Sequence, residues 1–421
     1  MIKNMAFFQR ALLKGHGNHY LALDIGTEFV KALVCAPEGN KVRVLGVGKK
    51  RQRLGEMQSG AVTDIAAVIN NCQEAIHNAQ KMAGVVAGQL IMGIAGELVK
   101  GATTTINYLR REPDTKIDLT ELKNIVHKVQ WKAFDEVRTE LAFETGYSEI
   151  DVKLVNAAIT DVRIDGYKVS NPLGFQGKDV TISIFNAFAP LVHYGALQTI
   201  AAELGMDLLA ITSEPYAVAR CMGYEDGGNF SAIFIDVGGG TTDLAIVRGG
   251  SVEGTRMFTL GGRTFTKRLA QSLNISFEEA EAIKLAYSNE KLEKQSHKIV
   301  REAMKSDCEV WLSGVALTLS EFENVDILPS KILLCGGGAH LPEIKEVLDG
   351  REWTHKLPFS HKPHIAFMQP KMVTNVIDET KQLKDIQDIT PMALANIALE
   401  YISEEQILSK LLKKVVRLMQ I

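Results

Sequence analysis

The chain has 421 residues, of which 46% are hydrophobic and 23% are charged, and its formal net charge is -3. This length exceeds that of one ordinary domain and favours two lobes or several subdomains. A net charge so close to zero gives no general attraction for polyanions, so we expect no nucleic-acid partner. No segment approaches the roughly 20 apolar residues that cross a bilayer. Residues 1–14 also lack the apolar core of a secretory signal.

The five cysteines lie far apart in the sequence, and none belongs to a CxxC pair. An odd number of scattered cysteines indicates reduced, mostly buried thiols, a cytosolic address and no structural zinc site. They are Cys35, Cys72, Cys221, Cys308 and Cys335.

The amino-terminal part has the pattern of an α/β lobe. Residues 19–34 are typical of a strand, a tight turn and a second strand, and residues 41–49 continue in β pattern. Residues 64–83 carry apolar side chains at helical spacing, and residues 89–94 form an apolar run typical of a buried strand.

Residues 96–187 have a different texture, with alternating apolar runs around one helical stretch. Asp118 or Thr120 can cap that helix, and the Asp165-Gly166 pair predicts a hairpin turn. We interpret this segment as a small α+β module inserted in a larger fold.

After this module the α/β alternation returns, with a helix predicted over residues 194–204. Residues 231–247 repeat the strand–turn–strand pattern of residues 19–34, and an internal repeat of this kind indicates two duplicated lobes. Helices are predicted over residues 277–323, followed by a strand over residues 331–335.

The first glycine-containing loop follows a buried strand and includes Asp24, Gly26 and Thr27. Glycine lets the backbone approach phosphate oxygens, and successive N–H groups form an anion-binding concavity to which Thr27 can add a hydroxyl. Asp24, at the strand end, is placed to hold the hydration shell of Mg²⁺. An ordinary β-hairpin with glycine in its turn is the alternative for this loop alone.

The second loop is more specific, because three successive glycines give up side-chain packing that a plain hairpin would keep. Asp236 mirrors Asp24 and is the candidate partner on the metal side, whereas Asp243 can close the turn structurally. The predicted phosphate-binding residues of this loop are Gly238, Gly239, Gly240 and Thr241.

A third loop, Gly336, Gly337 and Gly338, precedes Pro342, which suits the first turn of a helix. A floor of glycines can accept a flat purine ring. The chain contains neither the GxxxxGK[ST] phosphate loop nor the GxGxxG dinucleotide pattern.

Three loops in this order resemble those of the superfamily of actin, sugar kinases and heat-shock chaperones. The resemblance implies an α/β actin-like ATPase fold of two duplicated RNase H-like lobes that binds ATP and Mg²⁺. It also implies roles for Lys31 at the phosphates, for Glu214 in orienting the attacking water, and for Glu281 and Lys284 at the adenosine. Lys31 and Glu281 could instead be solvated charges, and Glu214 an ordinary acid at a helix start.

Residues 164–177, together with residues 57–64 and 94–96, resemble passages of the bacterial cell-division protein FtsA. FtsA carries an α+β (SHS2-like) module in place of the usual small-subdomain insertion of actin. Two departures stand out: residues 284–331 are short and mostly helical, and no long linker precedes the last helix. The compact stretch resembles PilM, a cytoplasmic component of type IV pilus machinery.

The last residues predict an amphipathic helix, because apolar side chains share one arc and basic side chains the opposite one at ~100° per residue. Such a helix can lie in the headgroup plane of an anionic membrane, as the terminal helix of FtsA does. Packing on the protein's own core is the alternative. The predicted membrane-contact residues are Leu408, Leu411, Leu412, Val415, Leu418 and Met419, with Lys410, Lys413 and Arg417 on the basic arc.

The resemblance to FtsA implies a peripheral protein at the cytoplasmic face of the membrane, at the division site. It would polymerise there and tether the FtsZ ring by binding the carboxyl-terminal tail of FtsZ, with at most slow ATP hydrolysis. A PilM-like scaffold is the alternative, and a sugar kinase or chaperone-type ATPase is less favoured. The predicted division is 1–17 as an amino-terminal segment, 18–94 and 188–215 as the first lobe, 95–187 as the inserted subdomain, 216–266 and 330–400 as the second lobe, 267–329 as its shortened upper subdomain, and 401–421 as the amphipathic helix.

Overall fold

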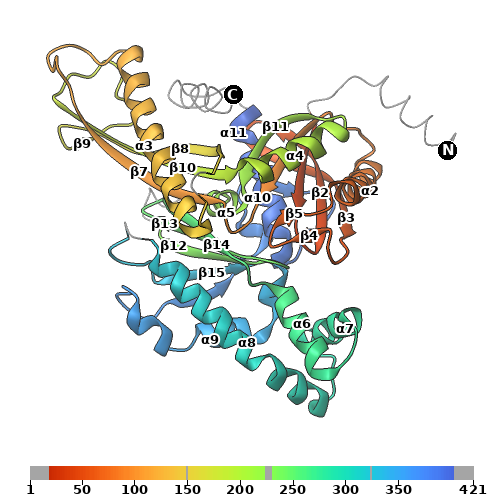
Figure 1. Cartoon of the computed structure of the whole chain (residues 1–421). Helices are drawn as coiled ribbons and strands as arrows, with labels where there is room; N and C mark the ends of the chain where they lie inside the picture. Colours follow the sequence, from red (N-terminus) through yellow and green to blue (C-terminus); the bar gives the residue numbers. More distant parts are fainter. Residues whose placement is uncertain (1–18, 148–149, 223–229, 323–324, 403–421) are drawn as a thin grey trace.

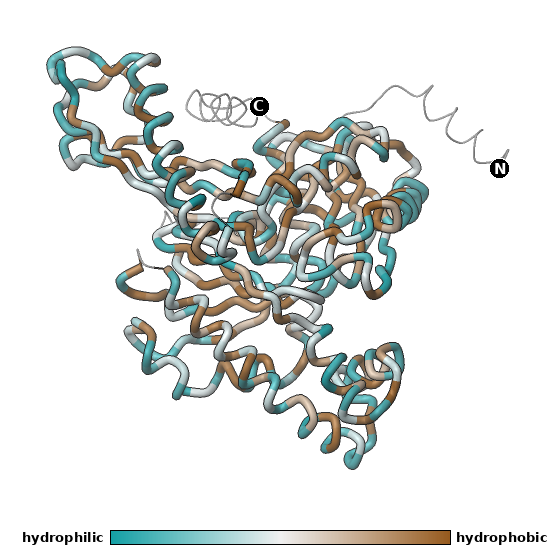
Figure 2. Tube along the Cα trace, in the orientation of Figure 1, coloured by the Kyte–Doolittle hydropathy of each residue, from teal (hydrophilic) through white to brown (hydrophobic). Residues whose placement is uncertain are grey.

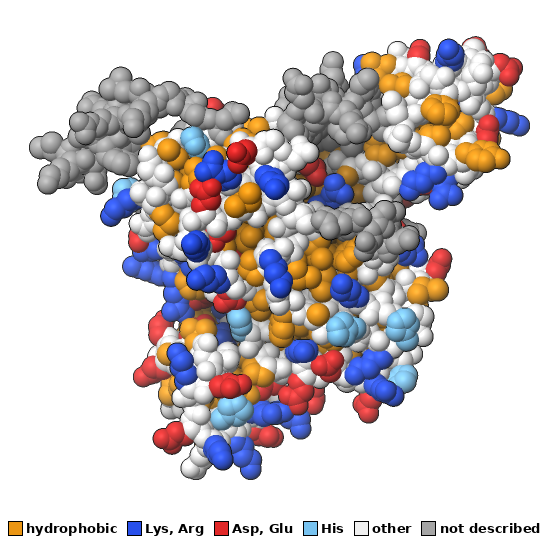
Figure 3. All heavy atoms as spheres, turned by 180° about the vertical axis from the view of Figure 1, so that it is seen from behind, with side chains coloured by type: hydrophobic (Ala, Val, Ile, Leu, Met, Phe, Trp, Pro, Cys, Tyr) orange, Lys and Arg blue, Asp and Glu red, His pale blue; other side chains and the backbone are white. Residues whose placement is uncertain are grey.

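The computed structural model describes residues 19–147, 150–222, 230–322 and 325–402. Two mixed β-sheets, each covered by helices, stand one above the other in Figure 1, and a narrower arm extends from the upper left of the view. Apolar chain concentrates in the strands of both sheets (Figure 2). Charged side chains of both signs are interspersed over the face seen from behind (Figure 3). Within the described ranges, no helix is long and apolar enough to cross a membrane.

The first sheet has six strands in the order β11-β6-β1-β2-β3-β17. The strands β1, β2 and β3 form an antiparallel meander, and β6 and then β11 add in parallel beside β1. The predicted strand–turn–strand near the amino terminus is therefore confirmed. The bounds are β1 Tyr20–Ile25, β2 Phe29–Glu38, β3 Lys41–Arg51, β6 Gln89–Ile94, β11 Asp207–Ser213 and β17 Val376–Asp378, beside a small hairpin of β4 Met57–Gln58 and β5 Ala61–Val62.

Helix α2 (Ile65–Ala83) packs on this sheet. Its first turn is capped by Asp64, whose carboxylate accepts a hydrogen bond from the Ala67 amide at 3.0 Å. Close approach depends on two glycines of β3: a Cβ on Gly46 or Gly48 would lie 2.1 and 1.9 Å from carbonyl oxygens of α2. The other helices of this lobe are α4 Leu191–Glu203, α10 Ile389–Ile397 and α11 Leu399–Ile402, and α5 Glu214–Arg220 lies between the lobes, packed on α10 and on β13 and β14 of the second sheet.

The second sheet has nine strands in the order β16-β15-β12-β13-β14-β7-β10-β8-β9. Its β12, β13 and β14 form an antiparallel meander with β15 parallel to β12, which repeats the arrangement of β1, β2, β3 and β6. This repeat confirms the predicted duplication of the lobes. The bounds are β12 Ala232–Val237, β13 Thr242–Arg248, β14 Ser251–Phe258, β15 Lys331–Cys335 and β16 His364–Phe367.

Helices build the rest of the second lobe around a core that includes Phe265, Tyr287 and Trp311. In the described part of the region that joins β14 to β15, the regular elements are helices, as the sequence pattern predicts. The helices are α6 Gly262–Leu273, α7 Phe277–Ser288, α8 Lys294–Ser320 and α9 Pro342–Leu348, with short 3-10 turns η1 Gly337–His340, η2 Glu352–Lys356, η3 Pro370–Met372 and η4 Ile386–Asp388.

The arm contains one long helix on a sheet of four strands, with a core of its own. Asp118 is the cap of α3, since its carboxylate accepts a hydrogen bond from the Glu121 amide at 2.7 Å. Asp165 and Gly166 form the predicted turn, with φ values of 50° and 85°. The elements are β7 Lys100–Leu109, α3 Leu119–Thr145, β8 Val152–Ile164, β9 Tyr167–Lys168 and β10 Asp179–Pro190.

The arm leaves the first lobe after β6 and returns to it at α4, yet its β7 pairs with β14 of the second sheet. The junction brings Gly101 opposite Thr255, and a Cβ on Gly101 would lie 2.2 Å from the Thr255 hydroxyl. The arm therefore touches both lobes.

One part of the predicted division is wrong. Residues 376–400 were assigned to the second lobe, but β17 pairs with β3, and α10 packs on β1, β2 and α5. This end of the chain belongs to the first lobe. We keep the remaining boundaries as a proposal. The predicted segment 1–17 and the amphipathic helix from 403 onward, with its membrane-contact residues Leu408 to Met419, lie outside the described residues.

Candidate functional site

A cavity of about 390 Å³ lies between the two lobes, where the ends of β1, β12 and β15 meet. Nearly every residue predicted for the site lines it, although these residues come from five separate stretches of sequence. The predicted residues that line it are Asp24, Gly26, Thr27, Lys31, Glu214, Asp236, Gly238, Gly239, Thr241, Glu281, Lys284, Gly336, Gly337 and Gly338.

Gly240 is the one predicted loop residue outside this lining, because it faces the first loop instead. A Cβ on Gly240 would lie 2.7 Å from the Thr27 hydroxyl, and one on Gly239 would lie 3.1 Å from the Glu28 Cβ. The two loops therefore touch each other across the lobes. Their glycines leave backbone amides accessible where side chains would otherwise fill the space.

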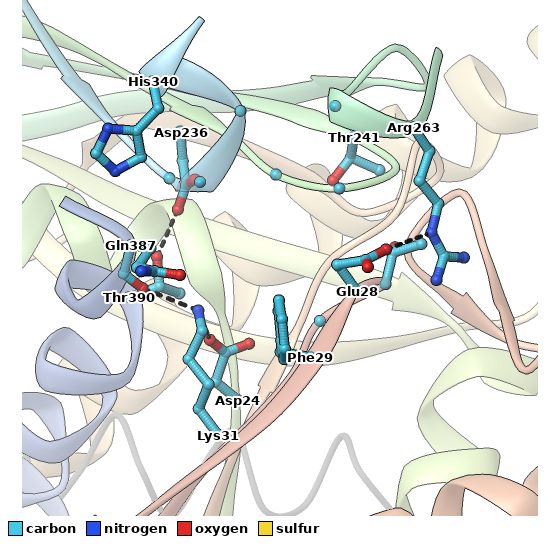
Figure 4. A pocket seen from close by; sticks show the side chains of 18 of the residues that line it. Asp24, Glu28, Phe29, Lys31, Asp236, Thr241, Arg263, His340, Gln387 and Thr390 are labelled. Carbon is cyan, nitrogen blue, oxygen red and sulfur yellow. Dashed lines mark hydrogen bonds and ion pairs between the residues drawn. The ribbon is translucent and has the colours of Figure 1, made fainter. Parts of the chain in front are cut away.

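Asp24 and Lys31 occupy directly opposite positions on β1 and β2, which explains their contact. The Lys31 ammonium donates to Asp24 at 3.0 Å and to the Gln387 carbonyl oxygen at 2.8 Å (Figure 4). Burial acts to lower the pKa of Lys31, but the neighbouring carboxylates, Asp24 first, raise it overall. Lys31 is therefore a half-buried, charged and paired group of the cavity rather than a solvated one.

Four buried carboxyl groups line the same cavity as this lysine: Asp24, Glu214, Asp236 and Asp243. Burial raises the pKa of Glu214 well above its ordinary value, and the charges of Asp24, Asp243 and Asp236 raise it further. Burial likewise raises the pKa of Asp236 and, more strongly, of Asp243. So much buried acid with so little compensating charge fits a site that receives a cation.

Asp243 carries a further sign of an incomplete site. Its Oδ1 is buried and has no hydrogen-bond partner in the described chain, and buried polar atoms are normally paired. Among the described residues, no three His, Cys, Asp or Glu side chains are grouped so as to ligate a metal ion directly. The carboxylates present fit a Mg²⁺ ion that keeps its water shell. Contact of Asp24 and Asp236 with Mg²⁺ through water therefore stays a prediction.

Glu281 and Lys284 line the cavity from α7 and are held by α6. The Lys284 ammonium contacts Glu281 at 2.8 Å, the Thr266 hydroxyl at 2.6 Å and the Gly262 carbonyl at 2.9 Å. Burial lowers the pKa of Lys284. Burial acts to raise the pKa of Glu281, but the charge of Lys284 and the hydrogen bonds from Lys284 and Thr266 together lower it. Both are fixed parts of the wall, and Glu281 is not the solvated charge of the alternative interpretation.

Residues 385–390 belong to the first lobe and contact the second lobe at the cavity rim, and we call them the strap. Asp385 lies 2.6 Å from the His340 Nε2, and the Ile386 carbonyl accepts from the Gly336 amide at 3.2 Å. The Thr390 hydroxyl donates to Asp236. The sequence carries no signal for the strap, because the strap has no glycine pattern. It also lies more than 350 residues from Lys31, whose ammonium donates to the Gln387 carbonyl.

Other lining residues also escaped sequence reasoning. Glu28 and Phe29 follow the first loop directly and were within reach of the motif. Arg263 follows the Gly261-Gly262 pair at the start of α6, a signal of close backbone approach that could have drawn attention to it. Its side chain meets Glu28 across the lobes (Figure 4).

The chain is similar in sequence and in fold to known proteins. The family model described as "Cell division protein FtsA" matches residues 233–387. FtsA of Neisseria meningitidis serogroup B is 27% identical over 272 residues, which cover 63% of this chain and 60% of that protein. FtsA of Enterococcus faecalis is 22% identical over 399 residues, covering 89% and 86%. The chain resembles FtsA. The resemblance seen in the motifs is thereby confirmed.

Among solved structures, the PilM chain of a "PilM-PilN type IV pilus biogenesis complex" is similar, with a TM-score of 0.62 and 19% sequence identity. The similarity covers 91% of this chain and 99% of that one. At this identity the likeness concerns the fold, and it confirms the predicted α/β actin-like architecture. The likeness to PilM noted for the compact helical stretch is confirmed as well.

Proposed function

We propose that this FtsA-like chain binds ATP with Mg²⁺ between its lobes and uses the nucleotide to control its own assembly at a membrane surface. The observation that carries the proposal is the single cavity formed by all three glycine loops, in a chain that resembles FtsA over most of its length. In this proposal the first two loops bind the phosphates through backbone amides and the Thr27 and Thr241 hydroxyls.

Four side chains would act on the phosphates and on the metal ion. Lys31 neutralises phosphate charge, and Asp24 and Asp236 hold the hydrated metal ion. Bound Mg²⁺ would neutralise charge on the phosphates. Glu214 would orient the attacking water, and burial, which raises the pKa of its carboxyl, disfavours the ionised form that this task needs. We therefore expect hydrolysis to be slow.

The adenosine would lie between α7 and the third loop. Glu281 and Lys284 would meet the ribose or base there, and Gly336, Gly337 and Gly338 would form the floor under the ring. Closure of the two lobes on nucleotide would favour one set of contacts between subunits over another. Head-to-tail contacts that do not close give filaments.

The membrane part of the proposal assigns attachment to the terminal helix, with Leu408, Leu411 and Leu412 in the lipid and Lys410, Lys413 and Arg417 toward anionic headgroups. Deletion of residues 408–421 should abolish sedimentation with anionic liposomes while the circular dichroism of the folded protein persists. A control that replaces Lys410, Lys413 and Arg417 with glutamine should weaken binding less. Full binding by the deleted protein would show that the anchor lies elsewhere.

The proposed partner is the FtsZ carboxyl-terminal tail, which would make the chain a tether of the division ring. A PilM-like scaffold of a pilus machine is the second candidate, favoured by the structural likeness that covers 99% of a PilM chain. The helical region over α6, α7 and α8 also favours it. Fluorescence anisotropy with an FtsZ tail peptide and an amino-terminal pilus-protein peptide separates them, because only the true partner should bind saturably.

A further inference from the structure

Arg263 crosses from the second lobe to the first at the rim of the cavity. It is the second residue of α6, and its backbone amide donates to the Gly239 carbonyl at 2.8 Å within its own lobe. Its guanidinium Nε donates to the Glu28 carboxylate, at 2.8 Å, on the turn between β1 and β2 (Figure 4). The two side chains are only 9% and 17% exposed, so this is a largely buried ion pair between lobes.

The other contacts of this guanidinium also lie in the first lobe. Its Nη1 approaches the Met57 carbonyl at 3.4 Å and its Nη2 the Gln52 carbonyl at 3.5 Å, both long for hydrogen bonds. Glu28 is thus its one strong partner. Without Glu28, a buried positive charge would keep only these two weak contacts, which is costly.

Glu28 has a second partner that does not cross the lobes. Its Oε1 accepts from Arg51, on β3 of the same lobe, at 2.6 Å, and its Oε2 accepts from Arg263. When the lobes part, Arg51 still compensates Glu28, while Arg263 moves with α6 into water. The contact can therefore open and close without leaving a charge buried alone.

This contact sits where the two phosphate loops meet. Glu28 directly follows Thr27, and a Cβ on Gly239 would lie 3.3 Å from the Glu28 amide nitrogen. Both Glu28 and Arg263 also line the cavity. Any separation of the loops must break the ion pair, so the pair and the cavity rim open together.

We propose that Glu28 and Arg263 form a clasp that holds the lobes closed over the cavity and sets the rate at which bound nucleotide leaves. The role in nucleotide release rests on the proposed function, whereas the closure of the lobes does not. Arg263 acts here as a positioning residue, because it holds the two loops together.

Hydrogen exchange of the unliganded full chain tests the closure directly. The Gly336 amide of the second lobe donates to the Ile386 carbonyl of the strap, which belongs to the first lobe, so it exchanges when the lobes separate. Glu28→Ala should speed this exchange roughly tenfold or more, since a charge-assisted bond is lost. Glu28→Gln, which keeps the shape, should give a smaller effect in the same direction.

Arg51→Ala is the matched control, because it removes the other partner of the same carboxylate within one lobe. The Arg51 side chain is 48% exposed, so exchange at Gly336 should change less than about threefold. Equal effects of Glu28→Ala and Arg51→Ala, or no effect of either glutamate variant, would overturn the clasp.

Nucleotide release is the second readout. Stopped-flow dissociation of a fluorescent ADP analogue should be roughly tenfold faster from Glu28→Ala than from the wild type or Arg51→Ala. Unchanged release from a protein that binds the analogue would refute the role of the clasp in release. If the wild type binds no nucleotide, the proposed function fails, and the exchange experiment alone decides whether the clasp exists.

Discussion

The contact between His340 and Asp385 should make attachment of the strap depend on pH. The His340 Nε2 lies 2.6 Å from the Asp385 Oδ1 and ties η1 of the second lobe to the strap. This hydrogen bond raises the pKa of His340 above its ordinary value, and it lowers the pKa of Asp385 from 3.8 to about 2. We predict that Asp385→Asn returns the pKa of His340 toward the ordinary value and loosens the strap.

The size of the effect follows from the shift of Asp385. A fall from 3.8 to about 2 corresponds to roughly 2.4 kcal/mol for a fully buried pair. The side chains are 45% and 36% exposed, so water screens the pair and about 1 kcal/mol remains. The ionised Asp385 stabilises the contact at pH values above its unfolded pKa, and this stabilisation is lost as pH falls through about 2. The protonated His340 stabilises the contact at pH values below its unfolded pKa, and this stabilisation is lost as pH rises through its raised pKa in the folded protein. The pair is therefore complete between about pH 4 and 6.5.

Two measurements check this reasoning. Proton NMR of the histidine ring resonances should show the His340 pKa falling in Asp385→Asn, while the other histidines titrate as before. Exchange of the Gly336 amide, which donates to the Ile386 carbonyl, should become about fivefold faster in the variant near pH 6 and equal to the wild type near pH 9. An unchanged His340 pKa, or a loss of protection that is the same at both pH values, would refute it.

Two further changes test the packing around the site. Gly48→Ala should reduce the free energy of unfolding by at least about 3 kcal/mol and so lower the thermal midpoint, because its Cβ would lie 1.9 Å from the Ala75 carbonyl of α2. Gly88→Ala, whose Cβ meets no atom within 4 Å, is the control and should be nearly neutral in the same scan. Gly240→Ala should disturb the contact of the two loops and reduce the free energy of unfolding by about 1 to 3 kcal/mol, since its Cβ would lie 2.7 Å from the Thr27 hydroxyl. A midpoint equal to that of the wild type would show that the loops can separate freely.

The sequence predicted the parts of the site that rest on local backbone chemistry. Glycines after buried strands marked all three loops, because a strand end that gives up side chains indicates close approach of another group. The contact of Asp24 with Lys31 also follows from a local pattern, since the two residues face each other in a hairpin. Duplication of the lobes was visible in the repeated strand–turn–strand pattern.

The parts that sequence reasoning missed depend on long-range packing. The strap reaches the cavity because β17, only three residues long, pairs with β3, and α10 packs on β1. A strand so short shows no alternation, so residues 376–400 were assigned to the wrong lobe. Arg263 and Glu28 are separated by 235 residues, and each alone has the appearance of a surface charge. Only the closed arrangement of the lobes brings them together.

Calorimetric titration of the full chain with ATP and Mg²⁺ tests the central claim most directly. The account predicts saturable binding by the wild type and by Asp349→Ala, an exposed aspartate at the end of α9. For Asp236→Ala it predicts a loss of affinity of roughly a hundredfold or more, because the carboxylate that would hold the hydrated metal ion is gone. No binding by the wild type, or unchanged affinity in a folded Asp236→Ala protein, would contradict the assignment of the cavity as a nucleotide site.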